Sequence, residues 1–255
     1  MNPNSDKIEY LLRLADSALI QGQRLCEWCG HAPALEEELA LMNVGLDLVG
    51  QARNWYEYAV ELLDDGRDAD HLAFRRDERA FRNLLLVEQP NGDFAVTIAK
   101  QFLYDAWHFH VLHALSSSSD ERIAAIAAKG LKEVTYHLRR SSEWMQRLGD
   151  GTEESHARML AAIPQVWRFT VDLCNADEVE QRLFEAGIAP NPTELANAWK
   201  VQGRRHLRRR DPAVAGACGE LLPQRPPWPA HRAPGHSPGR DAVPPAGLPR
   251  CNLVS

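Results

Sequence analysis

Residues 120–149, DERIAAIAAKGLKEVTYHLRRSSEWMQRLG, have the pattern of one long amphipathic helix. Asp120 is of a residue type that caps helix starts, and Gly149 is of a type that ends helices. Between them, side chains recur at the spacing of one helix face. That face carries Ile123, Ile126, Val134, His137, Leu138 and Met145. We therefore predict a helix long enough to be one member of a helical bundle.

Helical periodicity extends over the chain up to about Trp199. No convincing alternating strand pattern competes with it. The other predicted helices cover about residues 5–30, 33–63, 75–87 and 94–115, a segment that starts after Thr152 and contains Pro164, and two short segments at 177–186 and 193–199. The sequence thus predicts an all-α domain, built as a four-helix bundle with additional helices.

The helix that begins after Pro33 has a regular apolar stripe. Three glutamates, at positions 36–38, fill its first turn, where carboxylates favour the positive end of the helix dipole. The stripe consists of Leu35, Leu39, Met42, Leu46 and Val49. Because the apolar face of an amphipathic helix usually packs inward, we predict that this stripe lies in the core.

Composition limits the class of protein. The chain has 255 residues, of which 44% are hydrophobic and 25% charged, as in ordinary globular proteins. Its N-terminus is polar and it has no long apolar run, so we expect no secretory signal and no membrane span. The five cysteines are an odd number, so we expect a reducing cytoplasm and structural thiols, Cys26 and Cys29 included.

We searched the predicted helices for the ligand pattern of a di-iron bundle. Such a centre takes a Glu from each of two helices and Glu-x-x-His from each of the other two. The pairs Asp105/His108 and Glu133/His137 lie within helices and come nearest to this pattern. For the Asp-x-x-His motif of Asp105 and His108, we favour a buried, hydrogen-bonded pair over a metal site. The chain lacks two mid-helix Glu-x-x-His motifs, so half of a di-iron site is missing.

Five strings together resemble the C subunits of the ring 1,2-phenylacetyl-CoA epoxidases, the bacterial multicomponent monooxygenases of aerobic phenylacetate breakdown. They are EWCGHAP at 27–33, GLDLVGQARN at 45–54, LLLVEQPNG at 84–92, YDAWH at 104–108 and KEVTYHLR at 132–139. The resemblance runs from about residue 7 to Trp199. It implies a ferritin-like domain over residues 1–199. It also implies a cytoplasmic hetero-oligomer with a homologous A subunit, which carries the di-iron centre and binds the CoA thioester, and with a reductase.

The resemblance also implies a degenerate di-iron site in this chain, with no metal, no cofactor and no catalytic residue of its own. The ligand positions of the family carry Glu27, Leu48, Gln51, Asp105, Val134 and His137, with His108 nearby. Leu48 and Val134 replace two bridging carboxylates, so two iron ions would sit in an apolar, undercharged cavity at a large desolvation cost. We expect the polar residues of this set to form a hydrogen-bonded cluster.

Residues 200–255 have a different composition and depart from the family. Residues 201–255 hold 10 of the 16 prolines, and their nine arginines against three acids give a net charge of +6. Residues 1–200 then hold 20 basic and 32 acidic residues, a net charge of −12. We interpret the tail as a frameshifted, poorly ordered segment, since one-base-shifted codons for residues 232–249 can encode an amphipathic helix like the family's C-terminus. Resequencing the gene across the Trp199 codon tests this.

The sequence therefore predicts a non-catalytic structural subunit of a di-iron monooxygenase, with no nucleic-acid or membrane partner. One alternative is a self-sufficient ferritin-like metalloenzyme or iron-binding protein. It would have to assemble a site from Glu27, Asp105, His108 and His137 without bridging glutamates. A second alternative is a nucleic-acid-binding protein that uses the arginine-rich tail.

Overall fold

The computed structural model describes residues 3–173 and 175–208. Over these residues it contains helices and no strand, which confirms the predicted all-α class. The longer helices are α1 (Pro3–Cys26), α2 (Leu35–Leu63), α5 (Phe94–Leu115), α6 (Glu121–Gly149), α7 (Glu153–Trp167) and α9 (Pro192–Arg208). The shorter elements are α3 (Ala69–Phe74), α4 (Leu85–Glu88), α8 (Glu178–Glu185), and two 3-10 turns, η1 (Glu78–Ala80) and η2 (Val171–Leu173).

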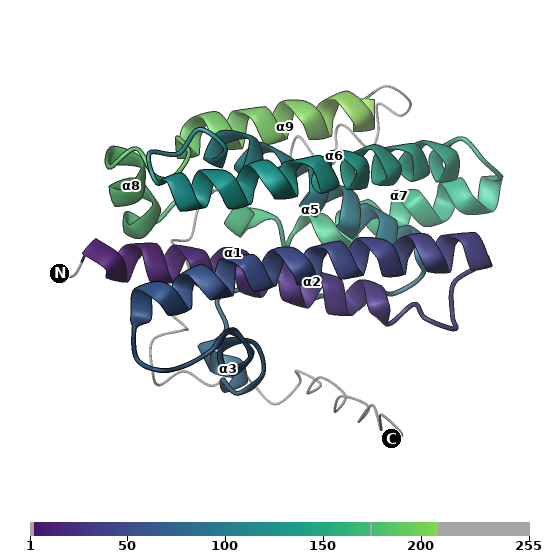
Figure 1. Ribbon diagram of the computed structural model, residues 1–255. Coiled ribbons are helices and arrows are strands. Elements are labelled where there is room, and N and C mark those ends of the chain that lie inside the picture. The colour runs from purple at the N-terminus through teal and green to yellow at the C-terminus, as the bar shows by residue number, and fades with distance from the viewer. Residues whose placement is uncertain (1–2, 174, 209–255) are drawn as a thin grey trace, which may run out of the picture. The chain divides into compact units, whose positions relative to one another are not determined.

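Helices α1, α2, α5 and α6 form the bundle. Helix α1 packs along α2 and α5 along α6, while α2 and α6 join the two pairs, as Figure 1 shows. Helices α7 and α9 pack on α5, and α8 packs on α1. The α1–α2 crossing is close, because a Cβ atom on Gly22 would lie 2.9 Å from the backbone oxygen of Gly45. Only glycine fits at position 22 without a shift of backbone.

Side-chain caps define several helix starts where the sequence predicted them. The Asp120 carboxylate accepts hydrogen bonds from the backbone N–H of Arg122 and Ile123, both at 3.1 Å. Thr152 accepts from Ser155 N at 3.2 Å and begins α7. These caps satisfy N–H groups that have no partner within the helix. The predicted ranges 94–115 and 120–149 therefore match α5 and α6 within a residue.

The predicted helix over residues 75–87 is wrong. This part of the α2–α5 crossover holds η1, an extended stretch and the start of α4. The reason is tertiary. The backbone N–H of Arg82 donates to the buried Asp16 carboxylate at 2.6 Å, and that of Leu84 donates to Ser17 Oγ at 3.1 Å. Because side chains of α1 accept these hydrogen bonds, the crossover backbone is extended along α1 and does not form the hydrogen bonds of a helix.

The predicted core stripe of α2 is also wrong. Leu35, Leu39, Leu46 and Val49 are 67%, 53%, 63% and 37% exposed, and Met42 is half-buried. The opposite face of the helix forms the core instead. Its buried apolar residues are Leu41, Val44, Leu48, Ala52 and Trp55. Helix α2 is thus apolar on two faces, and the sequence pattern alone does not say which one the bundle buries.

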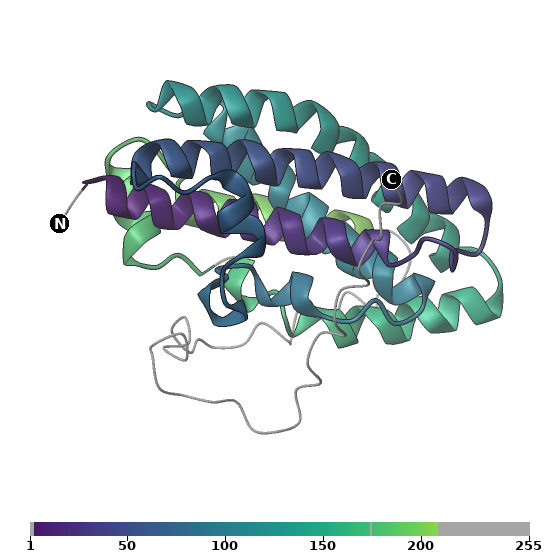
Figure 2. The same ribbon diagram turned by 60° about the horizontal axis from the view of Figure 1, so that its bottom comes forward.

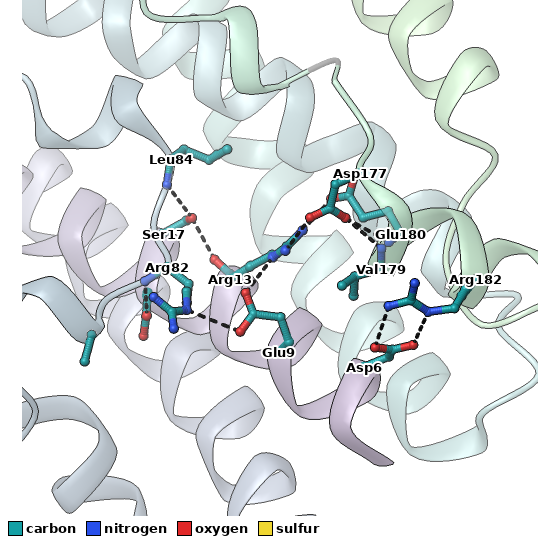
Figure 3. A network of polar contacts seen from close by, with 12 residues as sticks. Asp6, Glu9, Arg13, Ser17, Arg82, Leu84, Asp177, Val179, Glu180 and Arg182 are labelled. Atoms are coloured by element: carbon teal, nitrogen blue, oxygen red, sulfur yellow. Dashed lines mark hydrogen bonds and ion pairs between the residues drawn. The ribbon is translucent and has the colours of Figure 1, made fainter. Parts of the chain in front are cut away.

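Ion pairs attach the C-terminal part of the described chain to α1. Arg13 donates to Asp177 at 2.6 Å, just before α8, and Arg182 of α8 donates to Asp6 at 2.6 Å. Figure 3 shows these contacts together with the bond from Arg82 of the crossover to Glu9. Both α4 of the crossover and α8 pack on α1, which is the purple helix in Figure 2. Helix α1 therefore serves as the common support for segments far apart in sequence.

Helix α9 continues past Trp199, the predicted end of the helical domain, to Arg208. Trp199 itself is buried, stacks on Trp167 and donates its indole N–H to Leu103 O at 3.1 Å. The rest of the arginine-rich tail, residues 209–255, lies outside the described residues, so its interpretation stays a prediction. Within residues 3–173 and 175–208, no helix has the length and apolar character needed to span a membrane.

Candidate functional site

The interior of the bundle holds a layer of polar residues contributed by α2, α5 and α6. Between α2 and α6, Asp47 Oδ2 lies 2.9 Å from His137 Nε2, and Gln51 Nε2 donates to Glu133 at 2.7 Å. Between α5 and α6, Ser141 Oγ donates to Asp105 Oδ2 at 2.8 Å. These three bonds set the register of the helices. They place most of the sequence-predicted site residues at one level of the bundle.

Asp105 is the buried carboxyl of this layer. It is 1% exposed, and burial raises its pKa to about 7, against the lowering effects of the Ser141 hydroxyl and the Arg140 charge. A carboxyl with such a pKa is largely protonated below neutral pH. Its hydrogen bond therefore connects two helices without a fixed negative charge in the core.

Two imidazoles share the same layer. Burial, and secondarily the proximity of His137, lower the pKa of His108 to about 3. Burial also lowers the pKa of His137, although its hydrogen bond to Asp47 opposes this effect. The Tyr104 ring lies 5.1 Å from the His108 ring. Both histidines are therefore neutral near neutral pH, and His137 is oriented toward the α2–α6 edge by a partly exposed carboxylate.

These residues do not fit a di-iron centre. Leu48 and Val134, which the family resemblance assigns to the bridging-ligand positions, are fully buried and carry no donor atom. Gln51, which the resemblance assigns to the position of an imidazole ligand, donates its amide to Glu133. Across the described ranges, no group of three or more His, Cys, Asp or Glu side chains is arranged to hold a metal ion. The donor set forms a cluster of polar side chains that are hydrogen-bonded between helices.

Glu27 does not join this layer, although the sequence placed it among the site residues. It follows the last residue of α1, its side chain is 51% exposed, and it pairs with Arg24 and Asn91. On helix α1, the fully buried polar side chain nearest to Glu27 in the sequence is Gln21. Gln21 follows Ala18 and precedes Leu25 on the inner face of α1, so helical periodicity could have identified it.

Several buried polar atoms of the interior have no hydrogen-bond partner among the described residues. They include both amide atoms of Gln21 and Gln101, Gln51 Oε1, Tyr104 Oη, His108 Nδ1 and His137 Nδ1. Buried polar groups are normally paired, and an unpaired one costs about 1–3 kcal/mol. Gln101 and Tyr104 lie on α5 within one turn of Asp105, and no sequence motif marked them as part of the polar interior.

Two comparisons with known proteins agree with this arrangement. The model of the family described as "Phenylacetic acid catabolic protein" matches residues 2–211. The chain is also 56% identical over 193 residues to the C subunit of the 1,2-phenylacetyl-CoA epoxidase of Escherichia coli (strain K12), an alignment that covers 76% of this chain and 77% of the relative. The all-α bundle, its degenerate interior and these matches agree: the chain belongs to the phenylacetic acid catabolic protein family.

Proposed function

We propose that this chain is a non-catalytic structural subunit of a multicomponent phenylacetyl-CoA epoxidase. In this proposal it pairs with a homologous A subunit, which carries the di-iron centre and binds the CoA thioester, and the complex receives electrons from a reductase. The E. coli relative is named as a subunit of such an epoxidase. The observation that carries the non-catalytic role is that Leu48 and Val134, which this proposal assigns to the bridging-ligand positions, are apolar and fully buried.

The polar interior supports this role. Asp105 with Ser141, and His137 with Asp47, connect helices to each other. They fix the helix register, and the register determines which side chains the outer surface presents. In this proposal the chain contributes a rigid surface that holds the catalytic subunit in its active arrangement. It supplies no group to the oxidation itself.

The proposal is tested by expressing the full chain alone and together with the A subunit in iron-rich medium. Iron per chain is then measured by mass spectrometry, and phenylacetyl-CoA turnover is measured with the reductase. We expect substoichiometric iron in the chain alone, and turnover only when the A subunit is present. Stoichiometric iron in the isolated chain, with turnover by chain and reductase alone, would instead support the self-sufficient metalloenzyme.

A matched variant makes the test specific to the interior of this chain. His137→Gln removes the imidazole that comes closest to a surviving ligand, while an amide can still contact Asp47. We expect the co-expressed complex to keep its iron content and its turnover. Loss of iron from a complex that still assembles would show that this chain holds metal.

A further inference from the structure

The outer face of α2 carries a continuous apolar strip, which we call the α2 seam. It consists of Leu35, Leu39, Met42, Leu46 and Val49. Four of these side chains are among the most exposed large apolar residues of the described chain, and Met42 is half-buried. Large apolar groups gathered on one surface mark interaction sites more often than solvated faces.

The same helix already uses its opposite face for the core of its own bundle. There Leu41, Leu48 and Trp55 are at most 1% exposed. A helix at the edge of a bundle is normally polar on its outer side, whereas a helix that is apolar on both sides is buried on both. The outer side of α2 therefore has the composition of a second, intermolecular core.

The spacing of the seam indicates what packs on it. Its members follow one another at intervals of four, three, four and three residues. This is the 3.5-residue repeat that keeps one helix face against a neighbouring helix. The seam spans about 21 Å, from 14 residues at 1.5 Å each. Its complement is thus another helix, with an apolar seam of its own and a small crossing angle.

The acidic residues around the α2 seam further limit which helix can pack on it. Residues 35–49 contain four acids and no lysine or arginine. Glu37 pairs with Arg140 inside the chain, while Glu36 is exposed beside the seam. Two copies of this chain would face each other with the same acidic excess, whereas a partner with basic residues along its seam would be attracted.

We propose that the α2 seam is the surface on which a helix of the homologous catalytic subunit docks, with lysine or arginine residues of that helix facing Glu36 and Glu38. This inference rests on the proposed function and adds where the two bundles meet. Leucine side chains that become buried in an interface stabilise it by removing apolar surface from water. A charge at position 46 would be buried in that interface without a partner.

The test compares two single variants of the full chain, Leu46→Glu and Phe74→Glu. The two side chains are 63% and 62% exposed, so each variant adds the same charge at a similarly exposed apolar site. Phe74 ends α3, beyond the C-terminal end of α2, whereas Leu46 is a member of the seam with seam residues on either side. As a control for folding, the helical content and the unfolding temperature of both variants are compared with those of the wild-type chain by circular dichroism.

Binding to the purified A subunit of the E. coli epoxidase is then measured by titration. We expect Leu46→Glu to weaken binding by about 100-fold or more, and Phe74→Glu to change it by less than about twofold. Equal binding by Leu46→Glu and the wild-type chain would overturn the seam and leave the proposed function intact. Failure of the wild-type chain to bind would overturn the proposed function, and the seam proposal with it. A wild-type homodimer that Leu46→Glu dissociates would assign the seam to a second copy and overturn the proposed occupant.

Discussion

The interior of the bundle is unusually polar, whereas the outer face of α2 is unusually apolar. The interior contains unpaired amides and two neutral imidazoles where a core is normally apolar. The outer face presents leucines where a surface is normally polar. Neither feature stabilises the isolated chain. We infer that both reflect assembly: the interior has the form of a metal site without its ligands, and the outer face has the composition of an interface.

The strongest test of this difference is to introduce the same charge on either face of α2, in two separate variants. Leu48 is fully buried and Leu46 is 63% exposed, two residues apart on one helix. We expect Leu48→Glu to lower the free energy of unfolding of the isolated chain by about 4 kcal/mol, because the carboxylate is buried without a partner. Leu46→Glu should change it by less than about 0.5 kcal/mol. Urea denaturation measures both. Similar losses for the two variants would mean that the two faces of α2 are wrongly assigned.

A second prediction concerns Asp16, a buried polar group with several hydrogen-bond partners, in contrast to the interior amides whose polar atoms have no partner among the described residues. Asp16 accepts hydrogen bonds from Tyr56 Oη and from Arg82 N, and Arg76 forms an ion pair with it. We expect Arg76→Ala to destabilise the chain by about 3 kcal/mol, since it leaves the Asp16 charge buried without its cation. The exposed neighbour Arg75→Ala is the control. Equal unfolding midpoints for the two variants would contradict this.

The third prediction uses pH to probe the central layer. Burial raises the pKa of Asp105 from 3.8 to about 7. Between about pH 4 and 7 the folded carboxyl keeps a proton that the unfolded one has lost, so this group makes stability fall as pH rises. His108, with a pKa lowered from 6.5 to about 3, has the opposite effect below about pH 6.5.

Asp105→Asn removes the first effect and keeps the second. The stability of this variant relative to the wild type should therefore increase with pH between about 4 and 7, by up to about 1.4 kcal/mol per pH unit, and level off above. Urea titrations of both proteins across this range give the difference directly. Parallel stability curves would show that Asp105 is ionised in the folded chain.

The smallest effect is expected for an unpaired amide of the interior. Both polar atoms of the Gln101 side chain are buried without a partner among the described residues. Gln101→Met keeps a similar volume and removes the unpaired polar atoms, so it should raise the free energy of unfolding by about 1 kcal/mol. The exposed Gln181→Met serves as the control and should have no measurable effect. A destabilised Gln101→Met chain would show that the amide has a partner that stabilises it.

Much of this protein was predictable because local chemistry decides it. Asp120 and Thr152 cap α6 and α7 wherever the rest of the chain lies, since the acceptor and the N–H groups are within three residues of each other. The apolar periods, the absence of two Glu-x-x-His motifs and the family resemblance are likewise properties of the linear sequence. They determine the all-α class and the bounds of α5 and α6. The assignment of Leu48, Gln51, Val134 and His137 to degenerate ligand positions comes from the resemblance alone and stays a prediction.

The tertiary structure decided what depends on a partner distant in sequence. It made the crossover extended, because Asp16 and Ser17 of α1 bind the backbone of Arg82 and Leu84. It placed Glu27 at the surface and Gln21 inside, because α1 ends at Cys26. It also chose which apolar face of α2 enters the bundle. Periodicity reveals that a helix face is apolar, but two such faces satisfy the pattern equally, and only the packing of α1 and α6 against one of them decides between the two.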